Sequence, residues 1–185
     1  KMDADHLNLY SPPTGHLEHR RLLARWLENV GVTIEPSNLA LTSNARQAIS
    51  LAFDLACGPR GTILTERISY PGAIALARRK GHCLIGIDID AQGMVPQALS
   101  RALERVSCGH TAVYLTPTLH NPTTATMSAE RRQAIVEICR QANVWIIEDG
   151  VYALGHSATP ALATLAPERV FHVNGLSKTL GPGLR

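Results

Sequence analysis

The chain has 185 residues, 45% of them hydrophobic and 18% charged, so it is long enough and apolar enough for one buried core. It has no run of the ~20 apolar residues that a membrane span needs and no leader-like opening, so we expect a cytoplasmic protein without membrane contact. The formal net charge of +3 is spread along the chain, which argues against DNA binding by this segment itself.

Strands and helices are predicted to alternate after the turn-rich run Ser11–Gly15, which closes an arm or linker at residues 1–15. Helical spacing predicts a first helix around Leu23–Val30, ending at Gly31. The expected strands are Leu39–Thr42, Thr62–Thr65, Cys83–Ile89, Thr111–Thr116, Val144–Ile147 and Val170–Val173. Helical patterns lie between them at Ala48–Ala56, Ala73–Arg79, Val95–Arg105 and between Ser128 and Asn143.

Most of these strands are nearly continuous apolar runs, which is typical of parallel strands buried on both faces. We therefore predict an α/β fold with a doubly wound, mostly parallel sheet flanked by helices. In such sheets ligands bind beyond the carboxyl ends of the strands. The polar residues that follow each strand are the candidates for a binding site.

The four cysteines are far apart, form no Cys-x-x-Cys pair and have no histidine at zinc-ligand spacing. We expect reduced, mostly buried thiols and no metal site. The cysteines are Cys57, Cys83, Cys108 and Cys139.

Four polar segments follow predicted strands and should meet at one edge of the sheet: Ser43–Arg46, Pro117–Thr123, Glu148–Tyr152 and Asn174–Lys178. Taken singly, each has an ordinary explanation. Lys178 could be a surface lysine, Asp149 could pair with a cation or with water, and every strand-to-helix turn offers amides to an anion. Together, an amine for an aldehyde, a carboxylate for a ring nitrogen and an anion cup are what pyridoxal 5'-phosphate requires.

Several motifs resemble a known family in their order and spacing, over almost the whole chain. They are Tyr70-Pro71-Gly72, His120-Asn121-Pro122-Thr123, Asp149-Gly150-Val151-Tyr152, Ser177-Lys178 and Pro182-Gly183-Leu184-Arg185. The resemblance is to the large domain of fold type I, pyridoxal-phosphate-dependent aminotransferases of class I/II. It implies that residues 1–185 are this domain without the small C-terminal domain, and so a fragment of a larger protein.

The resemblance also implies roles for the reactive residues. Lys178 is similar to the lysine that forms a Schiff base with the cofactor and later shuttles a proton. Asp149 is similar to the acid that pairs with the pyridine nitrogen, and Asn121 and Tyr152 to the pair that hydrogen-bonds the phenolic oxygen.

Other residues resemble those that hold the cofactor. Tyr70 resembles the aromatic residue that stacks on its ring. The residues that resemble phosphate ligands are Asn44, Ala45, Arg46, Ser177 and Arg185.

Three positions depart from the family pattern. Asn44 stands where glycine is common, Arg46 where glutamine is frequent, and Gly175 where many members have a serine or threonine that binds phosphate. One hydroxyl contact is therefore expected to be missing, and Arg46 could compensate for it. Asn44 and Gly175 are the only support for an alternative in which the fold is kept but the cofactor is lost.

The stretch Leu115–Ser128 with Arg131-Arg132, and the run from Pro167 to Arg185, most resemble MocR-type regulators of the GntR family. In these, an aminotransferase-like domain senses an effector and a winged helix-turn-helix binds DNA. The alternative is the core of a free-standing aminotransferase that moves an amino group between an amino acid and a 2-oxo acid. Both imply an amino acid or amine ligand and a homodimeric parent protein, and whether the parent is an enzyme stays open.

Overall fold

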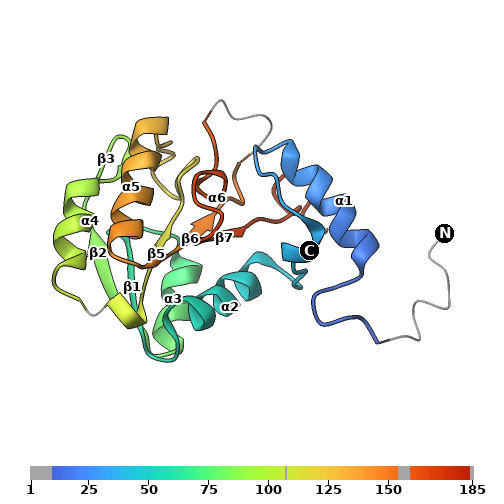
Figure 1. Ribbon diagram of the computed structural model, residues 1–185, viewed down its shortest axis with the longest axis horizontal. Coiled ribbons are helices and arrows are strands. Elements are labelled where there is room, and N and C mark those ends of the chain that lie inside the picture. Colours follow the sequence, from blue (N-terminus) through green and yellow to red (C-terminus); the bar gives the residue numbers. More distant parts are fainter. Residues whose placement is uncertain (1–9, 107, 154–158, 184–185) are drawn as a thin grey trace.

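The computed structural model describes residues 10–106, 108–153 and 159–183 (Figure 1). Arg185 and most of the predicted arm lie outside the described residues. The helices are α1 (Leu17–Glu28), α2 (Ala45–Cys57), α3 (Pro71–Arg79), α4 (Pro96–Leu103), α5 (Ala129–Gln141) and α6 (Leu162–Leu165), with 3-10 turns at Pro36–Asn38 and Cys108–His110. The strands are β1 (Thr62–Glu66), β2 (Cys83–Ile87), β3 (Ile89–Asp90), β4 (Gly93–Met94), β5 (Thr111–Leu115), β6 (Trp145–Asp149) and β7 (Val170–Val173).

Five strands form one parallel sheet in the order β2-β1-β5-β6-β7. The connections run outward in opposite directions from the β1–β5 pair, so the sheet is doubly wound and the predicted fold class is confirmed. The short strands β3 and β4 form a separate antiparallel hairpin, which the sequence patterns did not predict.

Helices cover both faces of the sheet (Figure 1). On one face, α2 and α3 pack over a core that includes Ile63 and Ile147. On the other, α4, α5 and α6 pack over a core that includes Leu64 and Ile146. Because side chains alternate along a strand, neighbouring residues at a strand's end serve opposite faces.

Local signals fix the ends of α2, which is longer than the predicted pattern Ala48–Ala56. The Asn44 side chain accepts a hydrogen bond from the Gln47 N–H at 2.9 Å, and Gly58 ends the helix with a φ of +65°. Cys57, the last residue of α2, packs against Gly61, just before β1 begins. The first turn of α2 therefore lies at the opposite edge of the sheet, where the strands end.

The prediction of a strand at Leu39–Thr42 is wrong, because this segment pairs with none of the described strands. Its backbone has one hydrogen bond to another segment, from the Leu41 N–H to the Thr14 carbonyl at 3.0 Å. The strand predicted at Cys83–Ile89 is divided at Asp88, whose carbonyl accepts from the Val95 N–H at 2.9 Å. In both cases a backbone partner elsewhere in the chain decides whether the segment forms a strand and where it ends. The composition of an apolar run does not reveal that partner.

Helix α1 packs beside the main body rather than on the sheet (Figure 1). Leu27 and the following Val30 and Val32 form a small core with Ala153 and Ala161. This core supports the chain that leaves β6. No helix in the described ranges is long and apolar enough to cross a membrane.

Three cysteine side chains are described, and all carry free thiols. Cys57 and Cys139 are buried, whereas Cys83 is exposed on the edge strand β2 and departs from the expectation of burial. Burial raises the pKa of the Cys57 thiol to about 11 and that of Cys139 to about 12, so both stay protonated and unreactive.

Candidate cofactor-binding site

Asp149 is the last residue of β6 and is only 4% exposed. Its Oδ2 accepts a hydrogen bond from the Tyr114 hydroxyl at 2.6 Å, and its Oδ1 accepts a longer one, 3.3 Å, from the Val151 N–H. Burial raises the pKa of Asp149, although both donors oppose this. No ion pair with a described side chain neutralises Asp149, so the carboxylate would gain from a cationic partner.

Tyr114 is a residue of the candidate site that the sequence reasoning missed. It lies in β5, packs edge-on against Phe53, and directs its hydroxyl to Asp149. Burial, with the neighbouring Asp149 charge, raises the pKa of Tyr114 well above its usual value, so its hydroxyl stays protonated and can donate to Asp149. A signal was present, because a tyrosine within a fully buried strand needs a partner for its hydroxyl.

Lys178 lies in the turn after β7, and its Nζ is 5.9 Å from the centre of the Tyr152 ring. The turn is closed by the Leu176 carbonyl, which accepts from the Leu180 N–H at 2.8 Å and from the Thr179 N–H at 3.2 Å. Lys178 is exposed, whereas Ser177 and Tyr152 are half-buried. The structure thus brings the predicted lysine to the loop that follows Asp149.

The first turn of α2 carries the residues predicted to form an anion cup. The Gln47 side chain folds back to accept from both the Ser43 N–H and the Ser43 hydroxyl at 2.8 Å, which fixes the turn. Asn44 caps the helix, leaving the Ala45 and Arg46 N–H groups without an acceptor in the described part of the chain. Two free amides at a helix start form a binding site for an anion.

The loop after β5 carries Asn121 and is held by a buried arginine that the sequence reasoning did not assign to the site. Arg132 of α5 is 1% exposed. Its guanidinium donates to the carbonyls of Met127, Pro117 and Pro160 at 3.1 to 3.2 Å and to the Thr118 hydroxyl at 2.8 Å. Asn121 itself is half-buried and precedes a cis peptide bond.

Tyr70 immediately precedes α3 and lies half-buried against the core beneath α2 and α3. Its ring passes so close to Gly72 that an added Cβ there would lie 2.3 Å from the tyrosine Oη. Glycine at this position therefore leaves room for the ring. The stacking of Tyr70 on the cofactor ring stays a prediction.

A second buried carboxyl, Glu66, ends β1. It accepts from the Thr116 N–H at 3.0 Å and from the Ser69 hydroxyl at 3.4 Å, with His120 Nε2 4.0 Å away. Burial raises the pKa of Glu66 to about 7, and burial lowers the pKa of His120. The Glu66 carboxyl is therefore mostly protonated below a pH of about 7.

Glu148, the residue that precedes Asp149, has different hydrogen-bond partners from Asp149. Glu148 accepts from the N–H groups of Leu162 and Ala163 at 3.0 Å and pairs with His172 Nδ1 at 2.9 Å. Burial alone would raise the pKa of Glu148, but His172 and the two backbone donors lower it. Glu148 is a structural anchor that caps α6.

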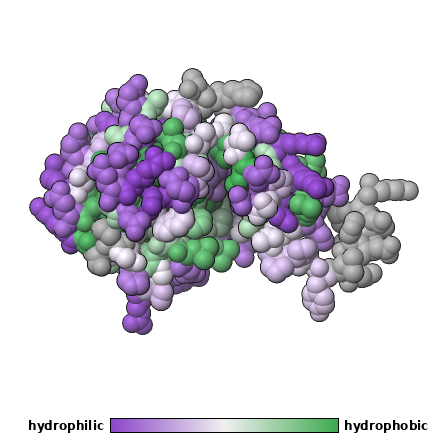
Figure 2. All heavy atoms as spheres, in the orientation of Figure 1, coloured by the Kyte–Doolittle hydropathy of each residue, from purple (hydrophilic) through white to green (hydrophobic). Residues whose placement is uncertain are grey.

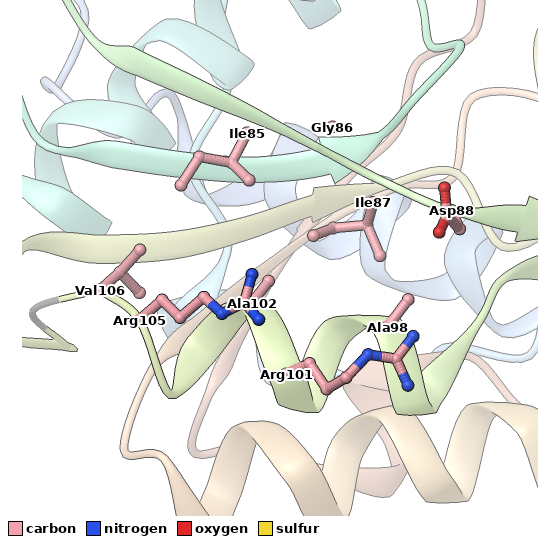
Figure 3. A pocket seen from close by; sticks show the side chains of 9 residues that line it. All are labelled: Ile85, Gly86, Ile87, Asp88, Ala98, Arg101, Ala102, Arg105 and Val106. Atoms are coloured by element: carbon pink, nitrogen blue, oxygen red, sulfur yellow. The ribbon is translucent and has the colours of Figure 1, made fainter.

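The hollow in Figure 3 lies away from this region and measures about 290 Å³. It opens between β2 and α4, with Ile85 and Ile87 on one side and Arg101 and Arg105 on the other (Figure 3). None of its lining residues was predicted for the site. Arg185, predicted to bind phosphate, lies outside the described residues.

Comparison with known proteins gives relatives of two kinds. The uncharacterized HTH-type transcriptional regulator YdeF of Bacillus subtilis (strain 168) is 31% identical over 160 residues, which cover 86% of this chain and 34% of that protein. An archaeal alanine:glyoxylate aminotransferase is 30% identical, with a TM-score of 0.86 over 95% of this chain and 45% of that one.

A second structure resembles the chain with a ligand of the expected kind. LysN, the alpha-aminoadipate aminotransferase from Thermus thermophilus, was solved with N-(5'-phosphopyridoxyl)-L-leucine. It is 27% identical, with a TM-score of 0.80, and the match covers 95% of this chain and 45% of that one. The chain thus spans less than half the length of each of these proteins. The family model "Aminotransferase class I and II" matches residues 2–185, and the chain therefore belongs to this family.

Proposed function

We propose that the chain is the pyridoxal-phosphate-binding, aminotransferase-like domain of a MocR-type transcriptional regulator. The observation that carries this proposal is Asp149, a buried carboxyl with a raised pKa that is bonded to two neutral donors. A protonated pyridine nitrogen is a cation that suits such a group. The regulator among the relatives supports the choice of protein class.

The residues present fit this cofactor. Asp149 would hold the ring nitrogen, Lys178 the aldehyde carbon, and the free amides of Ala45 and Arg46 the phosphate. Ser177 and Arg185 are proposed further phosphate ligands, Asn121 and Tyr152 are proposed to hold the phenolic oxygen, and Tyr70 the ring face. When bound, pyridoxal phosphate supplies an electron sink for the bonds at an amino acid's α-carbon.

The chain's own groups define what it contributes. The Tyr114 hydroxyl and the Val151 N–H orient the Asp149 carboxylate, so that it can keep a proton on a nitrogen placed against it. Lys178 is exposed and forms no ion pair with a described side chain, so its amine is accessible to a carbonyl group bound beside the Tyr152 ring. These residues would serve effector sensing and transamination alike.

The test for the cofactor uses the full-length protein. We expect a visible absorption band with pyridoxal phosphate that borohydride fixes onto Lys178, located by peptide mapping, and that Lys178→Ala lacks. The chain has three lysines, and Lys80 is a suitable control because its ammonium is paired with Asp54 at 2.5 Å. Labelling shared equally between Lys80 and Lys178 would contradict the proposal.

The alternative, the core of a free-standing aminotransferase, is supported by the archaeal enzyme at 30% identity. Two measurements separate the readings. A regulator binds a DNA fragment from its own operator region, with an affinity that changes when pyridoxal phosphate and an amine are added. An enzyme instead converts an amino acid and a 2-oxo acid with repeated turnover and shows no specific DNA binding.

The parent protein is proposed to be a cytoplasmic homodimer that binds DNA through a domain outside this segment and takes an amino acid or amine as its ligand. Figure 2 shows apolar side chains gathered over α2, where Leu51 is 46% and Leu55 70% exposed. Such a surface suits contact with a second subunit. Light scattering of the full-length protein tests the oligomeric state.

A further inference from the structure

A chain of hydrogen bonds runs from the end of β6 to the start of the lysine loop. His172 Nδ1 lies 2.9 Å from Glu148 Oε2, and His172 Nε2 lies 3.4 Å from Asn174 Nδ2. The Oδ1 atom of Asn174 accepts from the Gly175 N–H at 2.7 Å. Three links thus join Glu148, beside Asp149, to a residue three positions before Lys178.

The proton positions along this chain follow from its two ends. Glu148 has a lowered pKa and is ionised, so it can only accept, and the Nδ1 atom of His172 must carry a hydrogen. At the other end, the Asn174 Oδ1 is occupied by Gly175, so its NH2 group faces His172. The Nε2 atom is then placed to accept from this NH2 group.

Packing holds the imidazole in this orientation. An added Cβ on Gly150 would lie 2.5 Å from His172 Cε1 and 2.8 Å from Nε2, so the ring rests on the backbone just after Asp149. Glu148 is fixed in turn by the two N–H groups at the start of α6. The imidazole therefore has a rigid acceptor on one side and the lysine loop on the other.

We propose that His172 is a positioning residue that sets the lysine loop, and with it Lys178, relative to Asp149. The parallel register places His172 opposite Glu148 and Val173 opposite Asp149. Through Asn174, His172 orders the first peptide of the loop after Val173. This inference rests on the proposed function, because the position of Lys178 matters only if Lys178 holds the cofactor.

The test compares three variants of the full-length protein. His172→Phe keeps a ring but removes both polar nitrogens. His172→Gln offers a donor for Glu148 and an acceptor for Asn174, and serves as the conservative rescue. Asn174→Ala removes only the outer links at a half-buried residue, so it tests the idea even if His172→Phe does not fold.

The first readout is amide hydrogen exchange in residues 174–180 without cofactor, with α5 as an internal reference. Loss of a net hydrogen bond should speed exchange by about tenfold in His172→Phe and Asn174→Ala, and His172→Gln should stay within about twofold of wild type. Unchanged exchange in Asn174→Ala would overturn the proposal. So would exchange in His172→Gln as fast as in His172→Phe.

The second readout is the pyridoxal phosphate concentration that gives half-maximal adduct on Lys178. We expect it to rise about tenfold in His172→Phe and Asn174→Ala and to recover in His172→Gln. Faster amide exchange without any change in this concentration would overturn the proposal that His172 positions Lys178. A wild-type protein that forms no adduct would instead contradict the proposed function, and the exchange data distinguish the two failures because they need no cofactor.

Discussion

Glu148 and Asp149 are neighbours in sequence, and both are buried, yet their environments differ sharply. Glu148 faces the α4–α6 side and has two backbone donors and a histidine, which lower its pKa. Asp149 faces the α2–α3 side, where the donors are fewer and its pKa is raised. Burial alone therefore does not decide the state of a carboxyl at this edge, and the number and charge of its donors do.

The largest effect should come from removing the anchored carboxylate. Glu148→Ala leaves the Leu162 and Ala163 N–H groups and His172 without their partner, and should cost about 3–5 kcal/mol of unfolding free energy. Urea denaturation at pH 7 measures this. Glu137→Ala, on the exposed face of α5, is the matched control and should stay within about 0.5 kcal/mol. Equal losses of unfolding free energy in the two variants would show that the buried partners of Glu148 add nothing to stability.

Glu66 extends the comparison to a third buried carboxyl, which accepts from two neutral donors. Its pKa is raised from 4.5 to about 7, so the folded state keeps this proton at higher pH than the unfolded state does. Its contribution to stability is thus fully present below pH ~4.5 and declines by at most about 3 kcal/mol as the pH rises to ~7. Glu66→Gln should flatten the profile of unfolding free energy over this window. An unchanged slope would show that other groups cause it.

A smaller loss of stability is expected from a substitution at Gly150, whose backbone lies against the His172 ring. Gly150→Ala would push a methyl group against the His172 ring and should cost about 1–3 kcal/mol. Gly175→Ala is the control, because nothing lies within 4 Å of its added Cβ. Thermal unfolding of both variants compares them. Tolerance of alanine at Gly150 would mean that His172 is free to move.

The smallest effect on stability should come from the proposed cofactor ligand. Asp149→Asn keeps an acceptor for the Tyr114 hydroxyl and no longer buries a charge, so the cofactor-free protein should change by no more than about 1 kcal/mol. The Lys178 adduct should nevertheless weaken. A loss of more than about 3 kcal/mol without cofactor would place Asp149 among the anchors, with Glu148.

The features that were predictable from sequence are those set within a few residues. The helical pattern Ala48–Ala56 and the apolar run Val144–Ile147 are local signals, and they located α2 and β6 to within three residues of their observed ends. Leu39–Thr42 looked like a strand because its composition is right, but a strand also needs a neighbour.

The supporting residues of the site were not predictable in the same way. His172 reads as one position in an apolar run, and only the register of β6 and β7 places it against Glu148. Arg132 reads as half of an arginine pair on a helix, whereas its buried guanidinium donates to carbonyls of the loop before α5 and of the segment before α6. Such roles depend on contacts between distant segments, which spacing along one chain does not encode.

The enclosure of Arg132 also protects its interactions from dissolved salt. Dissolved ions screen exposed charges but have little access to a guanidinium that is 1% exposed. The loop that carries Asn121 should therefore keep its shape over a wide range of ionic strength. The affinity of a regulator for DNA falls steeply over the same range.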